Sequence, residues 1–164
     1  MIRVGMGYDV HAFGADGALV IGGVTVTDAP RLVGHSDADV VAHAVADSLL
    51  GPTGLPDLGE LFPASDPTYA GASSMVLLAE VATKVAAAGW WVANVDVVIA
   101  AERPRLGSHV GEMAANVVAA LVPAREPMGP GIHVAIRPKH GEGLGFVGRA
   151  EGIVAWAVAL LEHG

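Results

Sequence analysis

The feature that most constrains the fold is the alternation of short strand-like segments with longer helix-like segments along the whole chain. Apolar residues alternate or run together in the short segments, whereas in the longer ones they recur every three or four positions. We expect strands over 2–13, 90–100 and 132–136, a hairpin over 19–26, and helices over 38–50, 73–88, 106–121 and 148–161. This order predicts an α+β fold in which helices pack on one face of a mixed sheet.

The chain reads as one domain covering residues 1–164, because no repeat, low-complexity tract or linker divides it. Residues 53–72 are rich in Gly, Pro and Asp and are expected to form a long loop. Loops of that length in compact domains tend to carry function.

Composition restricts the classes of partner. Seventeen acidic against nine basic residues give a net charge of −8, which provides no general field for attracting nucleic acid. No apolar run approaches the roughly 20 residues that a membrane helix needs, so we expect a soluble, cytoplasmic protein without membrane contact. The chain has no cysteine, so a bound metal must use His, Asp or Glu. An anionic ligand would have to be attracted locally, by metal ions, helix N-termini or a few cations.

Asp9 and His11 lie two residues apart near the end of the first expected strand. Side chains at this spacing point to the same face of a strand, so both can bind one ion. The alternative is that this pair merely marks the end of a strand and a turn.

The expected helix over 38–50 adds a third candidate ligand, His43. Asp39, His43 and Asp47 form a polar stripe at helical spacing, opposite an apolar stripe. A solvent-exposed face is the alternative, but the helix carries no Lys, Arg or Glu. Asp9, His11 and His43 together make the two-His, one-carboxylate set of a catalytic site for zinc or manganese. Asp39 could orient one of the imidazoles.

Motifs across nearly the whole chain resemble one enzyme family, the 2-C-methyl-D-erythritol 2,4-cyclodiphosphate synthases of the non-mevalonate isoprenoid pathway. The matching stretches are Gly7–Phe13, Gly34–Ala44, Asp57–Pro63, Asn94–Asp96, Glu102–Leu106 and Gly143–Gly152. Their order along the chain is that of the family.

The resemblance implies a lyase that forms homotrimers with an active site at each subunit interface. Its substrate would be a nucleotide diphosphate, 4-diphosphocytidyl-2-C-methyl-D-erythritol 2-phosphate. The 2-phosphate attacks the β-phosphorus, CMP leaves, and a cyclic diphosphate remains. The substrate brings its own nucleophile, so the protein mainly has to align the phosphates and neutralise their charge.

The resemblance also implies roles for individual residues. Zinc would be held by Asp9, His11 and His43, and a second divalent cation, magnesium or manganese, by Glu142. His35 and Ser36 would contact the phosphates, with His35 steadying charge in the transition state. The erythritol would be held by Asp57, Leu58, Gly59, Phe62 and Asp66. The cytidine would be bound by residues of the neighbouring subunit, namely Ala101, Pro104, Arg105 and Leu106. Other substrate contacts would come from Glu142, Phe146 and Arg149.

One segment departs from the family. Where the family usually has Thr-Thr-Thr-Glu, this chain has Lys139-His140-Gly141-Glu142. Our hypothesis is that His140 or Lys139 takes over the phosphate contact, because a cation binds phosphate more strongly than a hydroxyl does. The alternative is a loop whose phosphate or cytidine binding has changed.

Two other functions stay open on the sequence. The chain could act on a different nucleotide-diphosphate substrate, or it could be a non-catalytic trimer that binds isoprenoid diphosphates. Arg149 and Glu151 match positions near the trimer axis, where some family members hold such a ligand. An inter-subunit salt bridge between these two residues is the alternative there.

Overall fold

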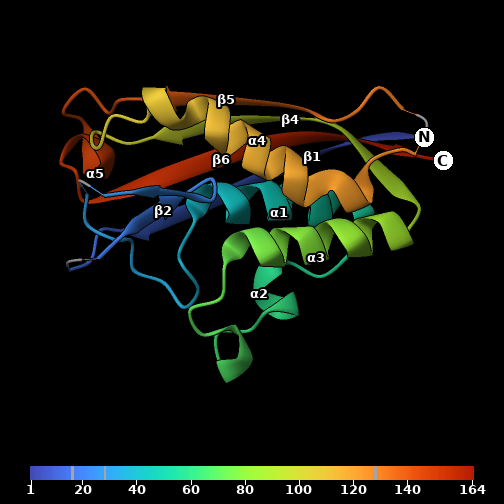
Figure 1. Cartoon of the computed structure of the whole chain (residues 1–164), viewed down its shortest axis with the longest axis horizontal. Helices are drawn as coiled ribbons and strands as arrows, with labels where there is room; N and C mark the ends of the chain where they lie inside the picture. Colours follow the sequence, from blue (N-terminus) through green and yellow to red (C-terminus); the bar gives the residue numbers. More distant parts are fainter. Residues whose placement is uncertain (16, 28, 128) are drawn as a thin grey trace.

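The computed structural model describes residues 1–15, 17–27, 29–127 and 129–164. The helices and strands follow the chain in the order shown in Figure 1. They are β1 (Ile2–Ala12), β2 (Leu19–Ile21), β3 (Val24–Val26), α1 (Val40–Thr53), α2 (Leu58–Leu61), the 3-10 helix η1 (Pro67–Tyr69), α3 (Ser74–Ala87), β4 (Trp90–Ala100), η2 (Gly107–His109), α4 (Val110–Leu121), η3 (Val122–Ala124), β5 (His133–Lys139), α5 (Gly145–Gly148) and β6 (Gly152–His163).

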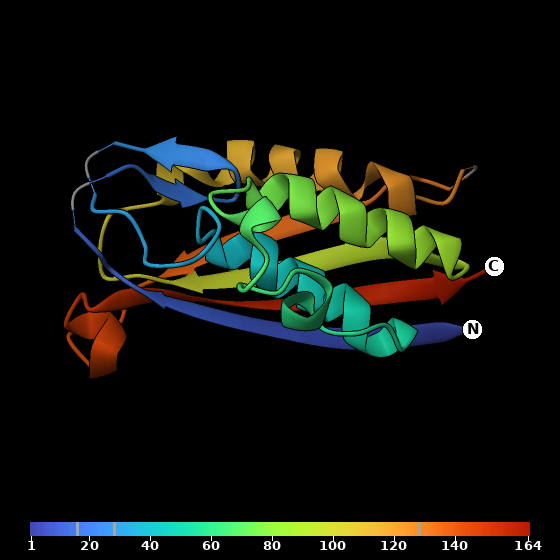
Figure 2. The same ribbon diagram turned by 90° about the horizontal axis from the view of Figure 1, so that it is seen from below.

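The main sheet has the order β1-β6-β4-β5. β6 is antiparallel to both β1 and β4, whereas β4 and β5 are parallel. β1, β4 and β5 therefore run in the same direction and end at the same edge of the sheet. The helices α1, α3 and α4 cover one face of this sheet, as Figure 2 shows. This arrangement confirms the predicted α+β fold with a mixed sheet.

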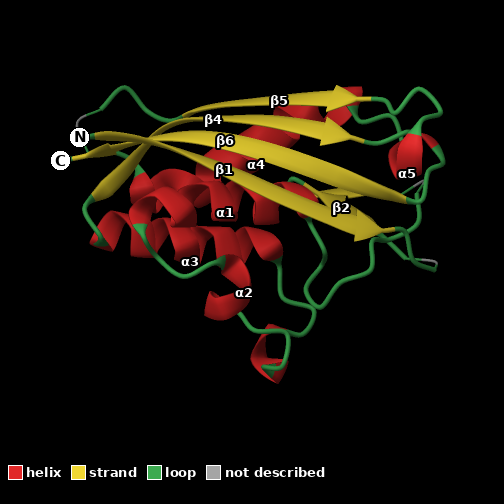
Figure 3. Ribbon diagram, turned by 180° about the vertical axis from the view of Figure 1, so that it is seen from behind, coloured by secondary structure: helices red, strands yellow, loops and turns green. Residues whose placement is uncertain are grey.

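The opposite face of the sheet lies in front in Figure 3, and none of the helices in the described part of the chain forms a layer on it. Large apolar side chains are exposed along this open face of β1 and β6, at Ile2, Val4, Met6, Tyr8, Val10 and Val158. None of the helices that the structure describes is long and apolar enough to span a membrane.

The predicted helix over 148–161 is wrong, because this segment forms strand β6. β6 lies between β1 and β4, and its residues Ile153 and Leu161 are fully buried under the helices. β6 is also apolar on its other face, at Trp156, Val158 and Leu160, so it reads as a nearly continuous apolar run rather than an alternating one. Periodicity alone does not separate such a run from a buried helix, and the three alanines of β6 favoured the helix.

Smaller corrections concern element ends. α1 continues through Pro52 to Thr53 and ends at Gly54, whose φ of 74° is typical of a glycine after a helix. The expected loop over 53–72 contains α2 and η1. β5 extends to Lys139, and the segment predicted as a helix over 106–121 starts with η2.

Two glycines of β1 bring α1 close to the sheet. A Cβ atom on Gly5 would lie 2.0 Å from the backbone oxygen of Ser48, and one on Gly7 would lie 1.8 Å from that of Ala44. No other residue type fits at this distance, so the glycines set the separation between β1 and α1. The residues that follow on the same face of β1, Asp9 and His11, therefore face the first turn of α1.

Candidate metal centre and substrate pocket

Asp9, His11 and His43 converge where β1 meets the start of α1. Asp9 Oδ2 lies 3.1 Å from His11 Nε2 and 2.9 Å from His43 Nδ1. One ligand atom from each residue lies within 4.8 Å of the others. Two ligand atoms of a tetrahedral zinc ion are about 3.3 Å apart, so small movements of these three side chains would allow them to hold zinc. The three ligands predicted from the sequence are thus brought together.

The hydrogen bonds around His11 show that it fits a metal. His11 Nδ1 lies 2.6 Å from the carbonyl oxygen of Val33, to which it can bond only as an N–H donor. In the neutral ring, the lone pair of Nε2 then faces Asp9. A histidine whose far nitrogen donates to a carbonyl is the usual arrangement of a metal ligand.

Asp9 and His11 stabilise each other's charge. Burial alone would raise the pKa of Asp9, but hydrogen bonds and attraction from His11 and His43 outweigh it and lower the pKa to about 2. The hydrogen bond from Asp9 raises the pKa of His11 above 6.5, against the effect of burial. The site therefore keeps a carboxylate ionised and favours a positive charge beside it, which a bound cation also supplies.

Asp39 does not orient an imidazole, contrary to the prediction. It caps the N-terminus of α1, is fully buried, and accepts hydrogen bonds from the backbone N–H groups of Gly22, Gly23, Val41 and Ala42. Its carboxylate thus ties the β2–β3 hairpin to α1. Asp47 likewise bonds a backbone group, accepting from Leu58 N at 3.1 Å, and so holds the start of α2.

The partners of His43 Nε2 are two hydroxyl groups, and the sequence did not indicate that they lie together. Ser74 Oγ lies at 2.9 Å and Ser36 Oγ at 3.2 Å from this nitrogen. Ser74 is the first residue of α3 and also bonds the carboxylate of Asp37. Asp37 belongs to the matched motif, but Ser74 is 31 residues from His43, and no local pattern links the two.

A pocket of about 280 Å³ opens beside the candidate metal site formed by Asp9, His11 and His43. It is lined by His11, His35, Ser36, His43, Leu58, Gly59, Phe62, Ala64, Tyr69 and Leu77. Of the residues predicted to bind phosphate and erythritol, His35, Ser36, Leu58, Gly59 and Phe62 are therefore together. Asp57 and Asp66 cap α2 and η1 by accepting from Glu60 N and Thr68 N.

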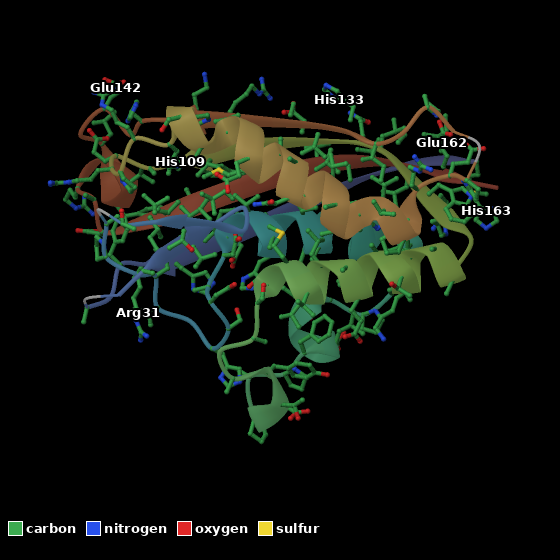
Figure 4. All side chains as sticks on the ribbon, viewed as in Figure 1. Arg31, His109, His133, Glu142, Glu162 and His163 are labelled. Carbon is green, nitrogen blue, oxygen red and sulfur yellow. The ribbon has the colours of Figure 1, made fainter. Side chains whose placement is uncertain are left out.

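The remaining predicted residues form a second group, in the segments that follow β4 and β5. Ala101 and Leu106 are buried in the core, at 4% and 2% exposure. Phe146 is partly exposed, at 37%. Glu142 lies at the α5 end of the molecule, apart from α2, as Figure 4 shows. Arg149 bonds Glu151 of the same chain, at 2.7 and 3.1 Å.

The segment that departs from the family has a defined conformation. Gly141 N donates to Glu102 Oε2 at 3.0 Å, and a Cβ atom on Gly141 would lie 2.5 Å from Gly148 N. A side chain at this position would therefore require the loop to move. Lys139 and His140 are exposed beside it.

Comparison with known proteins gives a consistent result. The sequence pattern of the YgbB family matches residues 2–162. The chain is 50% identical over 159 residues to a 2-C-methyl-D-erythritol 2,4-cyclodiphosphate synthase of Bordetella petrii, covering 97% of this chain and 94% of the relative. A bifunctional IspDF from Campylobacter jejuni has a similar structure, with a TM-score of 0.89 and 34% identity over all of this chain and 43% of that one. IspF from Plasmodium falciparum in complex with CDP has a TM-score of 0.81 at 27% identity, covering 99% and 96% of the two chains.

Proposed function

We infer that this chain, which belongs to the YgbB family, cyclises 4-diphosphocytidyl-2-C-methyl-D-erythritol 2-phosphate to 2-C-methyl-D-erythritol 2,4-cyclodiphosphate and releases CMP. The observation that carries this proposal is the convergence of Asp9, His11 and His43 beside the pocket that His11 and His43 line. The identity of 50% to a synthase along almost the whole chain supports the substrate. The reaction breaks a phosphorus–oxygen bond without water, which makes the enzyme a lyase.

We propose that Asp9, His11 and His43 hold zinc. When bound, zinc supplies a Lewis acid that polarises a phosphoryl oxygen. The residues themselves align the substrate: Ser36 and His35 face the pocket and can donate hydrogen bonds to phosphate oxygens. An oxygen of the 2-phosphate then forms the new bond to the β-phosphorus, and the bond from that phosphorus to CMP breaks, with the electron pair leaving on CMP.

The erythritol portion fits the wall formed by α2 and the residues around it. Phe62 and Tyr69 meet edge to face with ring centres 5.2 Å apart, which gives a firm apolar surface. Leu58 and Gly59 line the same pocket. In this proposal the carboxylates of Asp57 and Asp66 accept hydrogen bonds from the sugar hydroxyls at the exposed rim.

We propose that three copies associate through the open face of the sheet. The exposed apolar residues on β1, such as Met6 at 66% and Val4 at 65% exposure, form a patch of the kind that marks an interface. The β5 side of the same face is polar instead, with exposed Lys139 and with Arg137 paired to Asp96 of β4. A face with two unlike halves favours contact between different patches, and such contacts form a ring when the rotation between copies closes.

The active site requires residues from two copies. Asp9 lies on the helix-covered face of the sheet, with Gly7. On β5 the buried residue is Ile136, so its neighbours Arg137 and Lys139 point to the open face. Lys139 therefore cannot reach Asp9, His11 and His43 of its own chain, because the sheet separates it from them. We propose that the neighbouring copy supplies Lys139 and His140 to the phosphates, Glu142 to a magnesium or manganese ion, and the loop at Pro104 and Arg105 to the cytidine.

The association has a direct test. Replacing Met6 by Glu places a charge in the open face and should give monomers in sedimentation velocity, with loss of turnover. Val122→Glu is the matched control, because Val122 is 56% exposed on η3, away from the open face. A Met6→Glu protein that sediments like the wild type would contradict this interface.

The reaction itself is tested by incubating the chain with the proposed substrate and magnesium, followed by phosphorus NMR. We expect the cyclic diphosphate and CMP. Open-chain phosphates, or no turnover of the zinc-loaded protein, would contradict the proposal. A fall in the rate of His140→Ala would support the phosphate contact, whereas an unchanged rate would assign that contact elsewhere.

A further inference from the structure

A partly buried chain of hydrogen bonds leads away from the candidate metal site through His43. Its Nδ1 faces Asp9 at 2.9 Å, and its Nε2 faces Ser74 Oγ at 2.9 Å. Ser74 is 1% exposed and lies between His43 and the carboxylate of Asp37. His43 therefore connects two acidic groups, one on each side of its ring.

The direction of these bonds follows from the number of hydrogens available. An ionised carboxylate only accepts, so Asp37 takes the single hydroxyl hydrogen of Ser74, and it also accepts from the backbone N–H of Ser74 at 3.0 Å. The oxygen of Ser74 then has only lone pairs left for its other neighbours. It can bond His43 Nε2 only if that nitrogen carries a hydrogen.

We propose that Asp37 and Ser74 are positioning residues that hold His43 in the tautomer with its hydrogen on Nε2, so that the lone pair of Nδ1 points at the metal. This inference rests on the proposed function only for the presence of a metal. His11 is fixed in the complementary way by Val33, with the hydrogen on Nδ1 and Nε2 facing the cluster. The two histidines thus present different ring nitrogens to one ion, each set by its own acceptor.

The remaining neighbour of this chain, Ser36, is compatible with the assignment. Its oxygen lies 3.1 Å from Ser74 Oγ and accepts from the backbone N–H of Ala38 at 3.2 Å. The oxygen of Ser74 has two lone pairs, one for His43 and one for Ser36. The hydroxyl hydrogen of Ser36 can therefore turn to Ser74, or to a phosphate in the pocket, without disturbing His43.

Ser74→Ala tests the role, because it removes the acceptor that Asp37 orients toward His43. What remains beside Nε2 is Ser36 Oγ at 3.2 Å, a hydroxyl that can donate as well as accept. Asp9 Oδ2 also accepts at Nδ1 in metal-free protein, so the ring ¹⁵N resonances of His43 are read in metal-stripped Asp9→Ala protein, where they report which nitrogen carries the hydrogen. In that background we expect it on Nε2, and shared between both nitrogens when Ser74→Ala is added. Loss of such a partner typically weakens metal binding by about 10–100-fold, which competition with a chelating dye would measure.

Ser73→Ala is the matched control, because Ser73 precedes α3 and makes no side-chain hydrogen bond. It should leave both the spectrum and the zinc affinity unchanged. Asp37→Asn is a second test if Ser74→Ala does not fold. It keeps the size of the side chain but has one acceptor oxygen instead of two, and it should move both readouts in the same direction.

The proposal is overturned if His43 of the Asp9→Ala protein carries its hydrogen on Nδ1, or if Ser74→Ala and Asp37→Asn both bind zinc as tightly as the wild type. Failure of the wild type to bind zinc would instead contradict the proposed metal site, and the resonances would still decide the tautomer. Neither readout depends on turnover.

Discussion

Replacing Asp39 by Ala should destabilise the fold, because one buried carboxylate serves four backbone N–H groups. Two of them, Val41 N at 3.0 Å and Ala42 N at 3.2 Å, belong to the first turn of α1. The other two, Gly22 N at 2.9 Å and Gly23 N at 2.7 Å, belong to the turn between β2 and β3. The variant therefore loses a helix cap and an anchor for the hairpin at once.

The magnitude follows from these two parts. Losing the cap of a helix costs about 1 kcal/mol, and leaving the buried N–H of Gly22 without an acceptor costs about 1–3 kcal/mol. Part of this is offset, because burial raises the pKa of Asp39 and shows that its charge is itself costly to bury. We expect a net loss of about 2–3 kcal/mol in the free energy of unfolding.

Urea unfolding followed by circular dichroism measures this loss, with all variants metal-stripped and at one protein concentration. Ser73→Ala is the matched control, since Ser73 stands before a helix of the same length, 14 residues, but makes no side-chain bond. Its free energy of unfolding should change by less than about 0.5 kcal/mol. A loss below about 1 kcal/mol for Asp39→Ala, or an equal loss for Ser73→Ala, would refute the reasoning.

Three other outcomes follow from the site and its support. Gly7→Ala should push α1 away from β1 and cost about 1–3 kcal/mol of folding free energy, because its Cβ would lie 1.8 Å from the backbone oxygen of Ala44. Gly111→Ala is the control, because a Cβ atom at that position meets nothing within 4 Å. Equal thermal midpoints for the two variants would contradict the close approach of α1 to β1. In metal-stripped protein, NMR titration should place the pKa of His11 above 6.5, and this pKa should fall in Asp9→Asn. The stability that His11 gains from Asp9 should be fully present at pH values just below 6.5. It should be lost as the pH rises through the raised pKa of His11. Removing zinc with a chelator should abolish turnover and lower the thermal midpoint, since zinc at 100 times its Kd stabilises the folded state by about 2.7 kcal/mol. A thermal midpoint that the chelator does not change would count against a bound metal.

Local patterns were sufficient for much of the site. The two-residue spacing of Asp9 and His11 places both on one face of a strand whatever the strand packs against. The pair Gly22-Gly23 predicted the hairpin, and its φ values of 58° and 70° explain why both positions are glycine. The strand at 90–100 has the predicted bounds. These features depend on neighbours in the chain, so the sequence alone determines them.

Tertiary structure decided the rest. The final segment is a strand because β1 and β4 bond it on both sides, and its apolar run would suit a buried helix equally well. Asp39 serves the backbone and not a metal ligand, because the hairpin folds over the start of α1. The bond from Ser74 to His43 joins helices far apart in the chain, and the sheet places Lys139 on the face opposite Asp9. Such contacts depend on which surfaces meet in space, and spacing along a chain carries no information about that.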